Sequence, residues 1–82
     1  MTLNEFVKLV ANEFSLTPAD SFNPSTRYRE LEEWGSLTAL SVVDAIDDEM
    51  DVQITGATLR SVNTIEELYN LVMSKNNGLS IR

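Results

Sequence analysis

Apolar residues recur with helical spacing in three stretches of this chain of 82 residues. In the first stretch, apolar side chains at positions 3, 6, 7, 10, 11 and 14 follow the spacing of a single helix face. Thr2 and Glu5 have the spacing of a capping box, so we expect this helix to begin immediately. No segment alternates convincingly as a strand, although residues 52–55 are the least helical stretch. The pattern therefore predicts an all-helical domain.

The second stretch predicts a helix over residues 36–50, with an apolar stripe that alternates steps of three and four residues. The stripe consists of Leu37, Leu40, Val43, Ile46 and Met50, and Ala39 and Val42 widen it. The opposite face carries acids and no base: Asp44, Asp47, Asp48 and Glu49, with Asp51 just beyond. Negative charge at the C-terminal end of a helix costs about 0.3–1 kcal/mol per residue, which suggests that the cluster has a use.

A long connection, residues 15–35, separates the first two helices. Thr17-Pro18 and Asn23-Pro24 interrupt helical structure there, and Pro18 is suited to open a single turn. We expect four side chains to pack this connection over the helix ends, as a satellite of the core: Phe22, Tyr28, Leu31 and Trp34. The basic residues Arg27 and Arg29 are expected to pair with Glu30, Glu32 or Glu33.

The remaining third of the chain predicts two further helices. Residues 56–61 read as a brief third helix, and the last helix begins near Thr64, which forms a second capping-box pair with Glu67. Asn76-Asn77-Gly78 is expected to end that helix and to leave a loose tail over residues 79–82. The predicted fold is a single domain, residues 1–82: a small four-helix bundle with a long loop between helices one and two and a short third helix.

Composition narrows the function. Six basic against thirteen acidic residues give a net charge of −7, which disfavours nucleic acid and anionic membranes as partners and favours basic protein surfaces. The chain has no cysteine and no histidine, which excludes disulfides, the usual zinc sites and a histidine base. Carboxylates without a partner group give no acid/base pair, so we expect no enzyme. Without a signal-peptide start or a long apolar run, we expect a cytoplasmic monomer.

Ser36, at the start of the predicted second helix, has two interpretations. It can cap the helix, as serine often does, or it can carry a group linked through phosphate, because a helix start stabilises negative charge. Gly35 leaves the hydroxyl open, but no base lies nearby in the sequence, so another enzyme must do the chemistry. The acidic face is likewise either a solvated surface or a docking surface; its spacing does not match a calcium loop, and we expect no metal site.

At this point the chain resembles the acyl carrier protein family. The resemblance rests on residues 31–43, LEEWGSLTALSVV, and on residues 64–72, TIEELYNLV, and it extends over essentially the whole chain. It implies a four-helix bundle in which Ser36 receives 4′-phosphopantetheine from coenzyme A through a magnesium-dependent transferase. The thiol of that arm carries acyl groups as thioesters. It also implies that acyl-loading and acyl-processing enzymes with basic patches dock on the second helix, at Leu37, Leu40, Ser41, Asp44, Asp47 and Asp48.

Three positions depart from the family pattern. Gly35 replaces the usual aspartate before the serine and so removes a charge beside the attachment site. Asp44 stands where carriers of fatty-acid synthesis usually have an apolar residue, and Ser41 where they often have an acid. These departures point to a specialised lipid, polyketide or secondary-metabolite pathway. They leave two alternatives open: an unmodified interaction module with the carrier fold, or an aminoacyl or peptidyl carrier.

Overall fold

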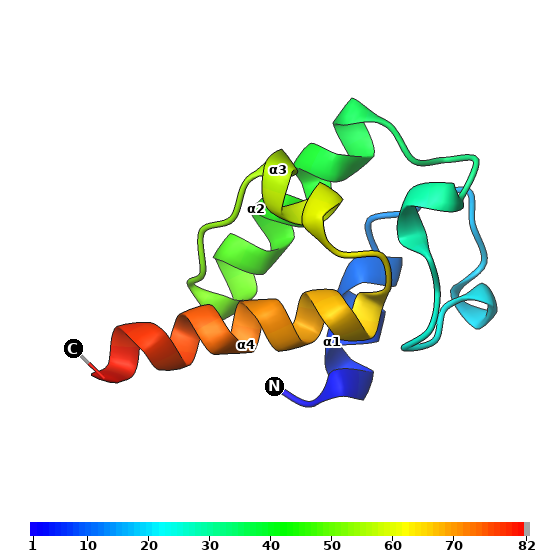
Figure 1. The fold of residues 1–82 in the computed structure, drawn as a ribbon. Coiled ribbons are helices and arrows are strands. Elements are labelled where there is room, and N and C mark those ends of the chain that lie inside the picture. The colour runs from blue at the N-terminus through cyan, green and yellow to red at the C-terminus, as the bar shows by residue number, and fades with distance from the viewer. Residues whose placement is uncertain (82) are drawn as a thin grey trace.

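The protein is a bundle of four α-helices in the part of the chain that its structure describes (Figure 1). A computed structural model describes the backbone of residues 1–81 and the side chains of residues 1–75. The helices are α1 (Leu3–Ala11), α2 (Ser36–Met50), α3 (Gly56–Ser61) and α4 (Ile65–Ile81). Two 3-10 turns, Ala19–Ser21 and Tyr28–Glu30, lie in the connection between α1 and α2. The all-helical prediction is thus confirmed, with a short third helix and a long first connection.

Capping fixes where these helices begin. The Thr2 N–H donates to Oε1 of Glu5 at 2.8 Å, and the Glu5 N–H donates back to the Thr2 hydroxyl at 3.2 Å. Thr64 and Glu67 exchange the same pair of bonds at 3.1 and 3.2 Å before α4. Each box satisfies two N–H groups that a helix start leaves without partners. Both predicted capping boxes are confirmed.

One core joins the four helices. Helix α1 packs against α2 and α4, and α2 also packs against α3. Fully or almost fully buried side chains come from every helix: Phe6 and Val10 from α1, Val42 and Ile46 from α2, Leu59 from α3, and Ile65, Leu68 and Val72 from α4. Burying a side chain of this size stabilises the fold by roughly 1.5–3 kcal/mol. The core therefore holds α2 by one face only and leaves its other face free.

Aromatic residues of the long connection belong to this same core and do not form a satellite of it. Phe22 and Tyr28 are buried, and Phe22 lies 5.1 Å from Phe14 between ring centroids. The Trp34 ring stacks at 6.2 Å on Phe14 and meets Tyr28 edge to face at 5.3 Å. The residues immediately before α2 are thereby fixed to the bundle.

Tyr28 and Arg29 join the long connection to the segment between α3 and α4. The Tyr28 hydroxyl donates to the carbonyl of Leu59 at 2.5 Å, and burial raises the pKa of Tyr28 to about 12. Arg29 donates to the carbonyl of Val62 at 3.1 Å and to Oδ1 of Asn63 at 2.6 Å. The expected pairing of Arg29 with a glutamate is therefore wrong, because backbone and amide oxygens occupy its guanidinium. Arg27 does pair with Glu30, at 3.7 Å on the surface.

Helix α4 differs from its predicted end. It continues through residues 76–78 to Ile81, so Gly78 does not terminate it and residues 79–81 are helical. An interior glycine costs a helix about 1 kcal/mol, which lowers helix stability without forbidding helical backbone. Arg82 lies outside the described residues. The end of α4 extends beyond the other helices (Figure 1). Among the described residues, none of the helices combines the length and the apolar character needed to span a bilayer.

Helix α2 has the predicted bounds but not the predicted buried face. Val42 and Ile46 are buried, whereas Leu37 is 82% exposed and Leu40 57% exposed. At 100° per residue, Ala39, Val43 and Met50 lie on the same side as the buried pair, and each packs against the core. The apolar residues of α2 thus span two faces, and the core takes the one that Val42 and Ile46 define.

Candidate functional site

The approach to α2 is held by the side chain of Glu33. Its Oε1 accepts hydrogen bonds from the N–H of Leu16 at 2.9 Å and from the N–H and hydroxyl of Thr17, both at 3.0 Å. Its Oε2 accepts from the Ser15 hydroxyl at 3.1 Å. One carboxylate therefore ties the turn after α1 to the residues before α2. Hydrogen bonds to a carboxylate are shorter and roughly twice as strong as neutral ones.

These bonds set the protonation of Glu33. Partial burial acts to raise its pKa, but the hydrogen bonds from Leu16, Thr17 and Ser15 outweigh this and leave the pKa below its usual value of 4.5. The charged form is favoured because it accepts all four bonds. Glu33 and residues 15–17 together form a clamp, and at neutral pH Glu33 holds it in its ionised form.

Ser36 is the first residue of α2, and it does not cap the helix. The N-cap is Gly35, which offers no side-chain hydrogen bond, and the first helical bond runs from the Ala39 N–H to the Gly35 carbonyl at 2.9 Å. Ser36 is exposed, and its hydroxyl bonds to none of residues 1–75. The capping interpretation of Ser36 is therefore wrong. A hydroxyl without a structural task is left at the helix start.

The first turn of α2 presents unused donors beside that hydroxyl. The N–H groups of Ser36, Leu37 and Thr38 precede the first N–H that bonds within the helix, and no acidic side chain lies in this turn. Such N–H groups, with the positive end of the helix dipole, stabilise an anion by roughly 0.3–1 kcal/mol at an exposed site. The residues fit a phosphodiester on Ser36.

Gly35 is not required by the backbone. Its φ of −174° and ψ of −175° are extended values that any residue adopts, and a Cβ built there meets nothing within 4 Å. The glycine keeps the approach to Ser36 open, but a side chain would fit. An aspartate at this position is therefore compatible with the fold.

The exposed face of α2 joins an apolar end to an acidic end. Leu37 and Leu40 open this face, and it continues at helical spacing through Ser41, Asp44 and Asp48. At a rise of 1.5 Å per residue, Asp44 lies about 12 Å from Ser36 along the axis and Asp48 about 18 Å. Two exposed leucines near Ser36 and acids two to three turns away thus lie on one side of α2.

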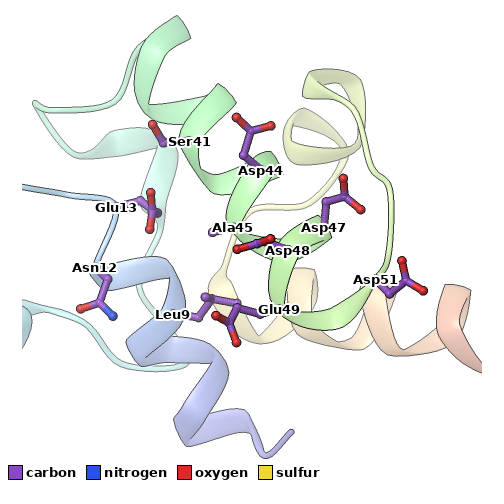
Figure 2. Close-up of a pocket in the computed structure, with 10 residues that line it drawn as sticks. All are labelled: Leu9, Asn12, Glu13, Ser41, Asp44, Ala45, Asp47, Asp48, Glu49 and Asp51. Carbon is purple, nitrogen blue, oxygen red and sulfur yellow. The ribbon is translucent and has the colours of Figure 1, made fainter.

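The acids of α2 line an open groove with the end of α1 (Figure 2). Leu9, Asn12 and Glu13 border it on one side. The other side is formed by α2 and its C-cap: Ser41, Asp44, Ala45, Asp47, Asp48, Glu49 and Asp51. Six carboxylates, from Glu13, Asp44, Asp47, Asp48, Glu49 and Asp51, thus border one groove. None of them forms an ion pair within residues 1–75.

Asp51 ends α2 in an unusual conformation. Its φ of 56° is left-handed, which aspartate tolerates better than most residues, and its N–H donates to the Asp47 carbonyl at 2.9 Å. The acids at this end do not converge on one point. No group of three or more acids among the described residues is arranged to hold a metal ion.

The predicted site residues of α2 differ in their exposure to solvent. Leu37, Leu40, Asp44 and Asp48 are exposed on one side of α2, and Ser41, which is half-buried, lies beside them. Asp47 is half-buried and also borders a hollow with Val43 and residues 53–55, so it lies at the side of that face.

Two contributions were missed from the sequence. Glu13 enters the groove from the turn after α1, and Glu33 closes the clamp. Glu13 follows Leu9 by four residues, so the two share one side of the chain at helical spacing. This spacing points to the groove only once α1 is known to border α2. For Glu33, the partners are 16–18 residues away in the sequence, and no local pattern marks them.

Comparisons with known proteins do not extend this picture. No protein-family model matches the chain, and neither does any curated protein or solved structure.

Proposed function

We propose that the protein is an acyl carrier whose Ser36 bears a 4′-phosphopantetheine arm, and that it serves a specialised lipid, polyketide or secondary-metabolite pathway. The observation that carries the proposal is the Ser36 hydroxyl, which is exposed, forms no hydrogen bond with residues 1–75, and stands at the start of an acidic helix. The arm supplies a terminal thiol on which an acyl group travels as a thioester. The chain itself, which has no cysteine, supplies none.

Attachment is a group transfer with coenzyme A as donor. The Ser36 oxygen forms a bond to the phosphorus that bears the pantetheine, the phosphoanhydride bond of coenzyme A breaks, and 3′,5′-ADP leaves. The hydroxyl proton passes to a base of the transferase, because the chain has no histidine and its lysines, Lys8 and Lys75, are remote from Ser36 in the sequence. Magnesium bound by the transferase neutralises the diphosphate. The protein is thus the substrate of this reaction and not its catalyst.

Residues around Ser36 suit such an arm. The first-turn N–H groups and the helix dipole favour the phosphodiester charge. Ser36, Leu40 and Val43 follow one another at helical spacing, so an arm that leaves Ser36 along the helix lies beside apolar side chains. Beyond Val43 lies the hollow that Gln53, Ile54 and Thr55 also line.

Partner enzymes are proposed to dock on the exposed face of α2. Leu37 and Leu40 offer apolar contacts next to the arm, and Asp44 and Asp48 offer charge to a basic patch. Complementary charge speeds association and orients the partner, whereas buried apolar contacts supply most of the affinity. A partner with its basic residues about 12–18 Å from the point where Ser36 meets its surface would match this arrangement.

Gly35 supports a second candidate function, that of an interaction module without the arm. Without the aspartate that usually precedes the serine, a transferase loses one charge to recognise, and the same fold would then act as an interaction module without an arm. An aminoacyl or peptidyl carrier differs only in its cargo. Both alternatives use the same face of α2, so the state of Ser36 separates the module from either carrier.

The test is whether the protein carries an acyl group on the thiol of an attached arm, since the chain has no cysteine. The protein is incubated with acyl-coenzyme A, magnesium and a promiscuous phosphopantetheinyl transferase, and is then treated with neutral hydroxylamine. A carrier gains one acyl-phosphopantetheinyl group and loses only the acyl part to hydroxylamine. A native chain that gains no mass, while a known carrier in the same mixture is fully converted, would contradict the proposal.

A further inference from the structure

The side chain of Glu33 links two segments that meet just before Ser36. Four hydrogen bonds of 2.9–3.1 Å join its carboxylate to Ser15, Leu16 and Thr17. Only Trp34 and Gly35 lie between Glu33 and Ser36 in the sequence. We propose that Glu33 is a positioning residue for Ser36: it holds the backbone before α2 in the conformation that the modifying enzyme recognises. This inference rests on the proposed function.

The backbone of Glu33 makes a second link, to the helix itself. Its carbonyl accepts a hydrogen bond from the Thr38 hydroxyl at 2.9 Å. Glu33 therefore contacts the turn after α1 through its side chain and the first turn of α2 through its main chain. Gly35 and Ser36, both exposed, lie between these anchors.

Trp34 supports the same stretch from the core side. Its ring lies against Phe14 and Tyr28, and its backbone N–H donates to the Leu31 carbonyl at 3.0 Å. Gly35 has neither a ring nor a side-chain bond to hold it. Since glycine is the residue with the most conformational freedom, order at Gly35 depends on its neighbours. Glu33 is the neighbour whose side chain bonds to another segment.

The clamp also fixes the turn that carries Leu16. The Leu16 N–H is bonded to Glu33, while its side chain is 85% exposed. An exposed leucine on a fixed backbone can contact a partner with little loss of entropy. The turn of residues 15–17 would then be presented together with Ser36 as one rigid unit.

A loosened clamp affects recognition in a specific way. If only a fraction of molecules has the competent conformation, the apparent affinity falls by that fraction, whereas the chemical step in the bound complex is unchanged. Loss of Glu33 should therefore raise KM for the transferase and leave kcat nearly constant. Loss of a group that takes part in the chemistry would lower kcat.

Two substitutions grade the clamp. Glu33→Ala removes all four bonds. Glu33→Gln keeps the side-chain length and an amide oxygen that can accept two of the three bonds now made to Oε1, so it should retain part of the order. Glu32→Ala is the matched control, since it removes the same charge from an exposed neighbour that bonds to none of residues 1–75.

The experiment measures order and modification on the same samples. Amide hydrogen exchange at Leu16 and Thr17 reports the clamp, and steady-state transfer from coenzyme A by a promiscuous phosphopantetheinyl transferase reports recognition. We expect faster exchange and a roughly tenfold higher KM in Glu33→Ala, smaller effects in Glu33→Gln, and wild-type values in Glu32→Ala.

Each contrary outcome has a distinct meaning. Unchanged exchange in Glu33→Ala would show that the clamp does not hold the turn. Faster exchange with an unchanged KM would show that the clamp does not position Ser36. A native chain that is not modified at all would overturn the proposed function, and this inference with it, whatever the exchange rates show. An equal rise of KM in Glu32→Ala would attribute the effect to charge alone.

Discussion

The Thr38 hydroxyl donates a hydrogen bond to the carbonyl of Glu33 at 2.9 Å, across the exposed pair Gly35 and Ser36. The chain thus enters α2 with its geometry set by residues on either side of Ser36. Ser36 has no part in holding the turn that carries it. This separation of structure from site makes the role of Ser36 testable without loss of the fold.

Replacing Ser36 by alanine should leave stability within about 0.5 kcal/mol of the native chain, because an exposed hydroxyl without a bond is removed. Thr64→Ala is the contrasting variant, and it should cost about 0.5–2 kcal/mol because Thr64 caps α4. Urea unfolding measures both. An equal loss in the two variants would show that the Ser36 hydroxyl has a structural task.

Replacing Gly35 by aspartate should preserve the fold and raise stability by a few tenths of a kcal/mol at most. A Cβ meets nothing within 4 Å, and aspartate caps a helix slightly better than glycine does. If the missing charge limits recognition, the modification rate should also rise. A destabilised Gly35→Asp protein would mean that Gly35 is needed for the turn.

Reversing Asp47 and Asp48 to lysine should keep the fold and stabilise it by about 0.3–1 kcal/mol per residue, since positive charge suits the end of a helix. The same change should weaken binding to a basic partner and reduce the salt dependence of that binding. Isothermal titration at two salt concentrations measures this. Unchanged affinity would rule out the acidic docking surface.

Leu37→Ala should barely change stability, because Leu37 is 82% exposed. Ile46→Ala, on the buried face of the same helix, should cost about 2–5 kcal/mol. If Leu37 contacts the modifying enzyme, KM should rise in Leu37→Ala. Thermal unfolding and transfer kinetics together separate the two faces, and a large stability loss in Leu37→Ala would place Leu37 in the core.

Stability should fall as the solution is acidified below about pH 4.5. Hydrogen bonds from Thr2 lower the pKa of Glu5, and those from Asn63 and Thr64 lower the pKa of Glu67. For Glu33, hydrogen bonds outweigh the opposing effect of burial, as described above, and its pKa is also lowered. A carboxyl with a lower pKa in the folded state stabilises the fold above its unfolded value of 4.5. That stabilisation is lost as the pH falls through the folded value.

The variant Glu67→Gln tests this sign. Its unfolding free energy should vary less between neutral and acidic pH than that of the native chain, because one of the linked groups is gone. Glu66→Gln is the control, because Glu66 is adjacent to Glu67 but its carboxylate accepts no hydrogen bond from residues 1–75. Equal pH dependence of all three proteins would contradict the role assigned to Glu67.

Local signals in the sequence were sufficient for the helix starts. Thr2 with Glu5, and Thr64 with Glu67, act over three residues, and the structure contains both boxes. The bounds of α2 and α3 also follow from local spacing. The end of α4 could not be predicted in this way, because a glycine such as Gly78 permits a helix to end but does not force it to end.

Tertiary contacts decided the rest. The apolar residues of α2 fit two overlapping stripes, and only packing against α1 and α3 selects the one with Val42 and Ile46. Tyr28 and Arg29 bond to Leu59, Val62 and Asn63, more than thirty residues away. Likewise, no local pattern joins Glu33 to the turn of residues 15–17. The candidate serine could be named from the sequence, but the sequence could not show that its hydroxyl forms no hydrogen bond with residues 1–75.

The most direct test of the proposed carrier function is the intact mass of the native protein before and after incubation with coenzyme A, magnesium and a promiscuous phosphopantetheinyl transferase, followed by mapping of the modified peptide. We expect a gain of one phosphopantetheinyl group on Ser36, and no gain in Ser36→Ala. A native chain that stays unmodified, while a known carrier in the same mixture is fully converted, would contradict it.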